Sequence, residues 1–221
     1  MSPLDQLKAL SHEAKATEMA AYHKTALPCL GVSNPEINEL VKQWQAAGPP
    51  AVWLRDAHAL WESGIFEARI AAGKLLTKAR IKDDMAIWSE ITRWVPQFGG
   101  WAIADHACKA GERRLIADPT RLDLVETWTS APDFWTRRAA LVMTLPWAKF
   151  TNPKPEQITQ RERILGWTAT YSSDQEWFIQ KAVSWWLRTL STHDPDRVRA
   201  FMTDHGDNLK PFARKDATRK L

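Results

Sequence analysis

Apolar residues recur along most of the chain at the three- to four-residue spacing of amphipathic helices, and no segment alternates strictly as a half-buried strand does. Proline, glycine and Asp-Pro pairs interrupt this pattern at short intervals. It predicts helices over about 15–26, 34–47, 50–64, 65–80, 83–95, 101–110, 112–117, 120–129, 133–147, 155–171, 174–191, 194–204 and 207–220. Many helices with short breaks indicate an all-α fold, either a helical bundle or an α-solenoid.

Three of the predicted helices share a register in which an aromatic residue precedes a cation by three positions and an apolar run follows. The pairs are Phe66 with Arg69, Trp135 with Arg138, and Phe178 with Lys181. Their irregular spacing makes this a degenerate repeat, as in HEAT-like helix pairs in which every second helix lines a concave face. We therefore expect residues 1–221 to form a single α-solenoid of HEAT-like repeats with a basic concave face.

Composition excludes several classes of protein. Hydrophobic residues make up 44% and charged residues 25% of the 221 residues, which is typical of a globular chain rather than a disordered one. No apolar run is long enough to span a membrane, and the first residues lack the apolar core of a signal peptide. Cys29 and Cys108 are far apart, which favours a reduced, cytoplasmic protein. His106 lies two residues before Cys108, but nothing nearby completes a zinc site, so we expect no metal.

Tryptophan and positive charge are the unusual features. The chain has 13 tryptophans and a net charge of +4, which alone is weak support for a nucleic-acid partner. Residues 208–221 carry five cations and one acid, so the net charge of this segment equals that of the whole chain. It predicts a basic edge that includes Lys210, Arg214 and Lys215, although a solvated terminal helix explains the composition equally well.

One predicted helix places an acid beside an indole. Trp101 and Asp105 are four residues apart and share a helix face. In one interpretation Asp105 is an ordinary surface partner of Lys109, four residues further on. In the other, it is a carboxylate set into a basic surface. That arrangement makes sense only where a cationic group is expected to bind.

Two pairs of adjacent residues and one tyrosine are further candidates. Neighbouring helical residues point about 100° apart, so one of Trp185 and Trp186 could face a groove while the other packs in the core. The alternative is that both tryptophans pack. By the same logic, Arg137 or Arg138 should point outward, to a phosphate or an acidic neighbour. For Tyr22 a core position is favoured over a groove-facing hydroxyl.

Taken in order, five segments resemble the AlkD-like family of DNA alkylation repair enzymes, which are alkylpurine DNA glycosylases built from HEAT-like repeats. The segments are YHKTALPCLGV (22–32), LWESGIFEARIAAGKLL (60–76), GGWAIADHA (99–107), WTRRAALV (135–142) and SSDQEWFIQKAVSWWLR (172–188), followed by a basic C-terminal helix. The likeness covers nearly the whole chain.

The resemblance implies a role for each matching position. The catalytic residues would be Asp105, Trp101 and Trp185. The family's arginine falls on Arg138, with Arg137 next to it, and its tyrosine on Tyr22. Together with the cations already noted, this gives a set that would hold the DNA backbone: Arg138, Arg137, Tyr22, Lys181, Arg69, Lys210, Arg214 and Lys215.

The implied activity is hydrolysis of the N-glycosidic bond of cationic N3- or N7-alkylated purines in double-stranded DNA, in base excision repair. No lysine is placed as a Schiff-base nucleophile and no cofactor is implied, so the expected enzyme is monofunctional. We expect a monomer in the cytoplasm that associates with the nucleoid when bound to DNA. The alternatives are a non-catalytic HEAT-like module that binds distorted DNA, and a protein-interaction solenoid, whose binding would be insensitive to salt.

Overall fold

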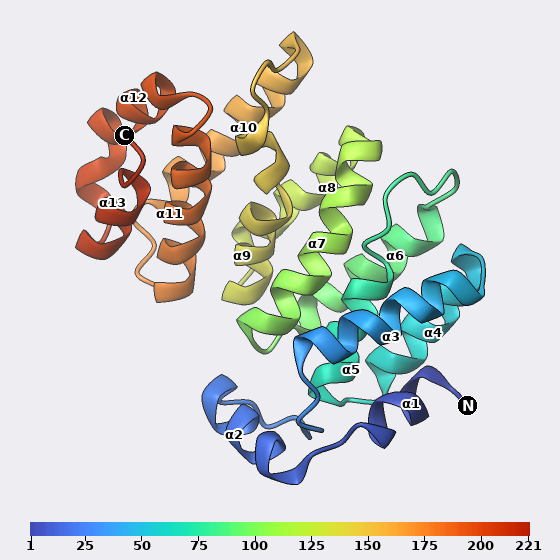
Figure 1. The fold of residues 1–221 in the computed structure, drawn as a ribbon. Helices are drawn as coiled ribbons and strands as arrows, with labels where there is room; N and C mark the ends of the chain where they lie inside the picture. Colours follow the sequence, from blue (N-terminus) through green and yellow to red (C-terminus); the bar gives the residue numbers. More distant parts are fainter. The chain divides into compact units, whose positions relative to one another are not determined.

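Thirteen α-helices and five short 3-10 helices make up the structure, a computed structural model that describes residues 1–221 (Figure 1). It contains no strand, so the all-α prediction is confirmed. No helix combines the length and hydrophobicity that a membrane-spanning segment requires. The chain divides into two compact units, Met1–Ala117 and Asp118–Leu221, each with its own core.

The first unit contains seven α-helices and one 3-10 turn. In chain order they are α1 (Pro3–Ala9), α2 (Glu13–His23), α3 (Asn34–Ala47), α4 (Pro50–Glu62), α5 (Phe66–Leu75), α6 (Met85–Trp94), η1 (Val95–Gln97) and α7 (Trp101–Ala117).

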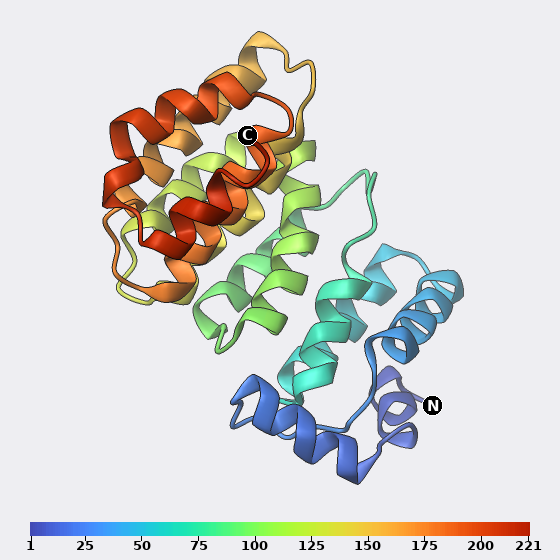
Figure 2. The same ribbon diagram turned by 60° about the vertical axis from the view of Figure 1, so that its left-hand side comes forward.

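The second unit contains six α-helices and four 3-10 turns. In chain order they are η2 (Pro119–Arg121), α8 (Leu122–Thr127), η3 (Trp128–Ser130), α9 (Phe134–Met143), η4 (Leu145–Lys149), α10 (Pro155–Tyr171), α11 (Trp177–Ser191), α12 (Pro195–His205), η5 (Gly206–Asn208) and α13 (Pro211–Ala217). In Figure 2, α12 and α13 (red) lie in front of the rest of this unit.

Some helix boundaries were predicted correctly because local capping residues determine where the helix begins. The predicted helix at 34–47 has the bounds of α3, because Ser33 and Glu36 form a capping box around a proline in the first turn. Helix α10 also matches its predicted bounds of 155–171. The first helix, α1, was not predicted, although Ser2 and Asp5 form the same kind of box there.

Two of the boundaries that differ from the prediction have a clear physical reason. The predicted helices at 101–110 and 112–117 form one continuous helix, α7, because Gly111 is buried and keeps helical geometry instead of ending the helix. The predicted helix at 133–147 ends at Met143 and continues as the 3-10 segment η4, because Pro146 cannot donate a backbone hydrogen bond.

Helix α5 is the centre of the first unit and packs against α3, α4 and α7. All of its residues are buried except Arg69 and Lys74. Its small residues let α7 approach closely: a Cβ on Gly73 would lie 2.8 Å from the carbonyl carbon of His106 and 2.9 Å from the backbone nitrogen of Ala107. The backbones of α5 and α7 are therefore in direct contact at this point.

Tryptophans fill both cores, and several of their indole N–H groups donate to side chains. In the first unit the rings of Trp61 and Trp94 stack with centroids 4.4 Å apart. Their N–H groups donate to Gln97 (2.9 Å) and Glu90 (2.9 Å). In the second unit, α11 packs against α9, α12 and α13, with Trp186 fully buried. Most of the 13 tryptophans are thus structural.

The contact between α5 and α7 predicts a large effect of a single methyl group. We expect Gly73→Ala to destabilise the protein by about 2 kcal/mol, because the new Cβ must push the two backbones apart. Gly166→Ala is the matched control, since nothing lies within 4 Å of a Cβ on this exposed glycine of α10. The control should be neutral or stabilise by about 0.5–1 kcal/mol. Urea unfolding followed by tryptophan fluorescence measures both; equal midpoints would contradict the prediction.

Candidate functional site

The candidate acid and indole lie on the first turns of α7. Helix α7 begins at Trp101, whose side chain is 38% exposed, and Asp105 lies partly buried one turn later. Because α7 is one continuous helix, the two residues share a face, as the sequence predicted. Two glycines, Gly99 and Gly100, precede α7, and no side chain of theirs covers this end of the helix.

An aromatic cluster from α2, α5 and α7 surrounds the Trp101 indole. The His23 ring packs between Trp101 (centroids 5.0 Å apart) and Phe66 (4.6 Å). Tyr22 meets Trp101 edge-on, with the ring centroids 6.4 Å apart. Tyr22 is 73% exposed, so the core position favoured for it from the sequence is wrong. Tyr22 is instead an accessible hydroxyl beside the candidate site.

A buried carboxylate on α5 fixes the segment that follows α2. Glu67 is fully buried, and its side chain accepts hydrogen bonds from the backbone N–H groups of Leu30 (2.9 Å), Gly31 (2.6 Å) and Val32 (3.3 Å). Gly31 has φ +78°, and a Cβ there would collide with the carbonyl oxygen of His12 at 2.3 Å. This loop therefore depends on Glu67 and on glycine, and it holds α2 against the site.

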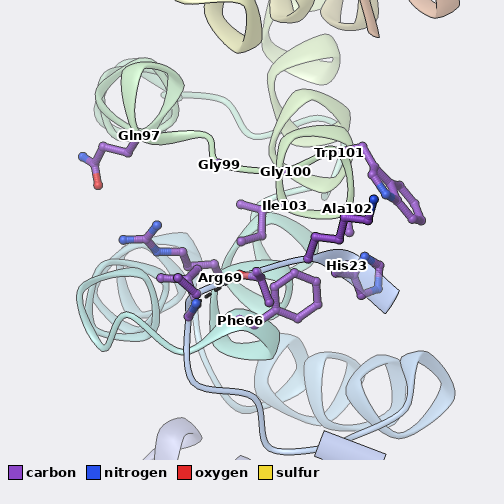
Figure 3. Close-up of a pocket in the computed structure, with 13 residues that line it drawn as sticks. His23, Phe66, Arg69, Gln97, Gly99, Gly100, Trp101, Ala102 and Ile103 are labelled. Carbon is purple, nitrogen blue, oxygen red and sulfur yellow. Dashed lines mark hydrogen bonds between the residues drawn. The ribbon is translucent and has the colours of Figure 1, made fainter. Parts of the chain in front are cut away.

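The exposed indole borders two hollows of the first unit. A pocket of about 390 Å³ is lined by Trp101, His23, Phe66, Arg69 and Gln97, with the glycines before α7 (Figure 3). Figure 3 shows Trp101 and His23 together at one end of it and Arg69 with Gln97 toward the other. A second hollow of about 230 Å³ is shared by Trp101, His23 and Phe66. Sequence reasoning missed His23, Phe66 and Gln97 as site residues.

Contacts with Trp61 fix the side chain of Arg69, so that it does not project freely into solvent. Its guanidinium carbon lies 4.9 Å from the centre of the Trp61 ring, and its Nε donates to the carbonyl oxygen of Trp61 (3.3 Å). Burial lowers the pKa of Arg69, and Glu62 opposes this effect. Arg69 therefore presents a positioned cation to the pocket.

The two histidines near the site are uncharged at neutral pH. Burial lowers the pKa of His23, against the opposing effect of Glu67. Burial and the charge of Lys74 lower the pKa of His106 to about 4, although Asp105 acts in the opposite direction. These neutral imidazoles add no positive charge around Trp101 and Asp105.

The lysine that could have paired with Asp105 has another partner. The Lys109 ammonium contacts the carboxylate of Glu112, three residues further along α7. Glu112 is therefore the acidic partner of Lys109, and the role of Asp105 stays a prediction.

In the second unit, burial distinguishes the two adjacent tryptophans of α11. Trp186 is 0% exposed and packs in the core, whereas Trp185 is partly exposed. The pair therefore agrees with the interpretation in which one tryptophan packs in the core and the other is accessible. Trp185 is the accessible one.

The adjacent arginines of α9 are both engaged. Arg137 donates to the carbonyl oxygens of Ala131 (2.9 Å) and Pro132 (2.9 Å) and pairs with Asp174 (3.2 Å). Arg138 is buried, with its guanidinium carbon 5.7 Å from the centre of the Trp135 ring. Arg137 has the acidic neighbour that the sequence allowed, and a DNA contact by either arginine stays a prediction.

The basic C-terminal segment forms a docked helix. Ala213 and Ala217 of α13 are buried, and Asp216 accepts from Ser184 (2.9 Å) and contacts Arg188. Helix α13 is therefore anchored on the core of its unit, and a DNA contact by its cations stays a prediction. Two of its cations are exposed, Arg214, which pairs with Asp207, and Lys215. Lys210, just before the helix, is partly exposed and donates to the Gln175 carbonyl. On α11, the Lys181 ammonium lies 5.3 Å from the Trp177 ring centre and 5.9 Å from that of Phe212.

Comparisons with known proteins match the full chain. A family model described as DNA alkylation repair enzyme matches residues 4–221. A predicted DNA alkylation repair enzyme from Enterococcus faecalis has a similar structure, with a TM-score of 0.79 and 24% identity over 96% of each chain. AlkD2 from Streptococcus mutans matches with a TM-score of 0.61 and 18% identity, over 86% of this chain and 90% of its own. These identities show the fold alone. A comparison with curated protein sequences finds no match.

The pKa of His106 predicts how stability depends on pH. The folded protein protonates His106 only near pH 4, whereas the unfolded chain does so near 6.5. Between these values the unfolded state holds more protons, so stability falls as the pH is lowered from about 6.5 to about 4. We expect this histidine to account for about 3 kcal/mol of that loss. Urea unfolding of wild type and His106→Gln at several pH values measures it. Parallel pH profiles for the two proteins would contradict the prediction.

Proposed function

Because the chain belongs to the DNA alkylation repair enzyme family, we propose that it is a monofunctional DNA glycosylase. Its substrates are N3- and N7-alkylated purines in double-stranded DNA, and its reaction is hydrolysis of the N-glycosidic bond. The observation that carries this proposal is the pair on α7: an exposed indole, Trp101, one turn from a carboxylate, Asp105, with no charged histidine beside them.

The chemistry of the lesion explains why such a pair is sufficient. A purine alkylated at N3 or N7 carries a positive charge and departs as a neutral base, so no acid is needed to protonate the leaving group. Positive charge develops on the deoxyribose as the bond breaks. A carboxylate near C1′ stabilises this charge and aligns the attacking water, and an indole face favours a cation through its quadrupole. Asp105 and Trp101 take these two roles.

The other candidate residues have supporting roles in the proposal. Trp185 is the accessible tryptophan of α11 and supplies a second indole face to the substrate. Tyr22 and seven cations contact the sugar-phosphate backbone of the DNA. Such contacts hold DNA without reading its sequence. The cations are Arg69, Arg137, Arg138, Lys181, Lys210, Arg214 and Lys215.

The proposed complex is simple in composition. A monomer whose helices stack as HEAT-like repeats, with a basic concave face, would grip one duplex. The reaction needs water and no cofactor. A DNA substrate places the enzyme in the cytoplasm, on the nucleoid when it is bound.

We predict that Asp105→Asn abolishes most of the activity without abolishing DNA binding. Removing one electrostatic stabiliser of the transition state should lower the single-turnover rate constant for 7-methylguanine release from a methylated duplex by about 100- to 1,000-fold. Asp83→Asn is the matched control, because Asp83 is an exposed acid of the same unit. Fluorescence anisotropy on the same duplex checks binding.

Each outcome of this experiment decides between enzyme and binding module. Normal excision by Asp105→Asn would refute the role of the carboxylate. A wild type that binds the duplex and releases neither 7-methylguanine nor 3-methyladenine would refute the glycosylase, and the chain would then be a DNA-binding module.

The neighbouring tryptophans of α11 should separate function from stability. We expect Trp185→Ala to lower the excision rate with little effect on the unfolding midpoint, because the ring is partly exposed. Trp186→Ala should lose about 3–5 kcal/mol of stability, because its fully buried ring leaves a cavity. Thermal unfolding and single-turnover excision measure the two effects. The same loss of stability in both variants would contradict the assignment.

A further inference from the structure

Four lysines of the first unit line one open groove of about 350 Å³. Lys42 comes from α3, Lys74 from α5, Lys78 from the segment after α5, and Lys109 from α7. No aspartate or glutamate is among the residues that line this lysine groove. Like charges on three packed helices repel one another, so their gathering needs an explanation other than packing.

Contacts within the protein neutralise only one of the four charges. Lys74 donates to the amide oxygen of Asn38 (2.6 Å), which is uncharged, and the Lys78 ammonium lies 5.8 Å from the ring centre of Trp53. Only Lys109 has an acidic partner, Glu112. Lys74 is also partly buried, and burial lowers its pKa. A partly buried ammonium without a carboxylate is unfavourable, and an anion in the groove would relieve it.

The groove lies next to the candidate site. His106 lines both the lysine groove and the smaller hollow beside Trp101, so the two share a wall. Along α7, Lys109 follows Asp105 by four residues, which corresponds to about 6 Å along the helix axis. A nucleotide facing Asp105 would therefore have the neighbouring phosphates of its strand within reach of these lysines.

We propose that the lysine groove binds backbone phosphates of duplex DNA beside the nucleotide that Asp105 faces. This inference rests on the proposed function and adds to it a binding subsite built from Lys42, Lys74, Lys78 and Lys109. Lysines are point charges that attract phosphates without demanding one geometry, which suits binding to any sequence.

The construction of the groove favours a run of phosphates over one small anion. Compact phosphate sites use bidentate arginine forks or the N–H groups of a helix N-terminus. No arginine lines this groove, and its residues lie in the interior or at the C-terminal ends of their helices. Cations distributed over three helices match the extended charge of a DNA strand.

The test removes the two exposed lysines, Lys42 and Lys78, as the double variant Lys42→Gln/Lys78→Gln. Binding to a methylated and an unmethylated duplex is measured by fluorescence anisotropy over a range of salt concentrations. Each lysine that contacts a phosphate contributes about 1 to the slope of log K against log salt, so the slope should fall by about 2 with both duplexes. Lys8→Gln/Lys82→Gln is the matched control, because it removes the same charge from exposed positions outside the groove.

The outcomes separate the groove from the proposed function. A slope that falls as little in the groove variant as in the control variant overturns the inference. The inference is also overturned if the groove binds only small anions. In that case about 10 mM inorganic phosphate would raise the melting temperature of the wild type but not of the groove variant, and the salt slopes of the two proteins for the duplex would be equal. If the wild type binds DNA, the groove variant loses slope, and neither excises a base, the groove stands and the glycosylase proposal fails.

Discussion

The close approach of α5 and α7 at Gly73 is the constraint on which the first unit depends. A Cβ at this position would lie under 3 Å from the backbone of α7, so only glycine allows the two helices to touch as they do. Helix α7 carries Trp101 and Asp105, and α5 carries Phe66 and Arg69. The contact thus sets the distance between the indole with its acid and the residues opposite them. A small residue in the core determines the geometry of a surface site.

A second constraint acts through the loop between α2 and α3. The buried Glu67 carboxylate satisfies three consecutive backbone N–H groups of this loop, and these would otherwise be costly to bury. The loop in turn holds the C-terminal end of α2, which brings His23 onto Trp101. Glu67 lies next to Phe66 in the sequence, so one helical turn of α5 supplies both a wall of the site and its support.

The sequence predicted best what local chemistry decides. The capping box at Ser33 fixed the start of α3, and the four-residue spacing of Trp101 and Asp105 required only that α7 be a helix. Contacts distant in sequence could not be predicted in this way. Whether Lys109 pairs with Asp105 or Glu112 depends on small differences in side-chain geometry. The exposure of Tyr22 depends on how α2 lies against α7, and a single helix pattern does not contain that information.

Under the proposed function, the distribution of charge in the first unit matches the two opposite charges of an alkylated strand. The damaged base and the developing sugar cation are positive, while the phosphates around them are negative. A site that served both with mixed charges would neutralise itself through internal ion pairs. Here Asp105 and one lysine of the groove, Lys109, lie one turn apart on α7, and His106, whose pKa burial lowers, lies between them in the sequence. In the proposed complex this neutral residue separates the carboxylate, which faces the cationic nucleotide, from the lysine groove, which faces the phosphates.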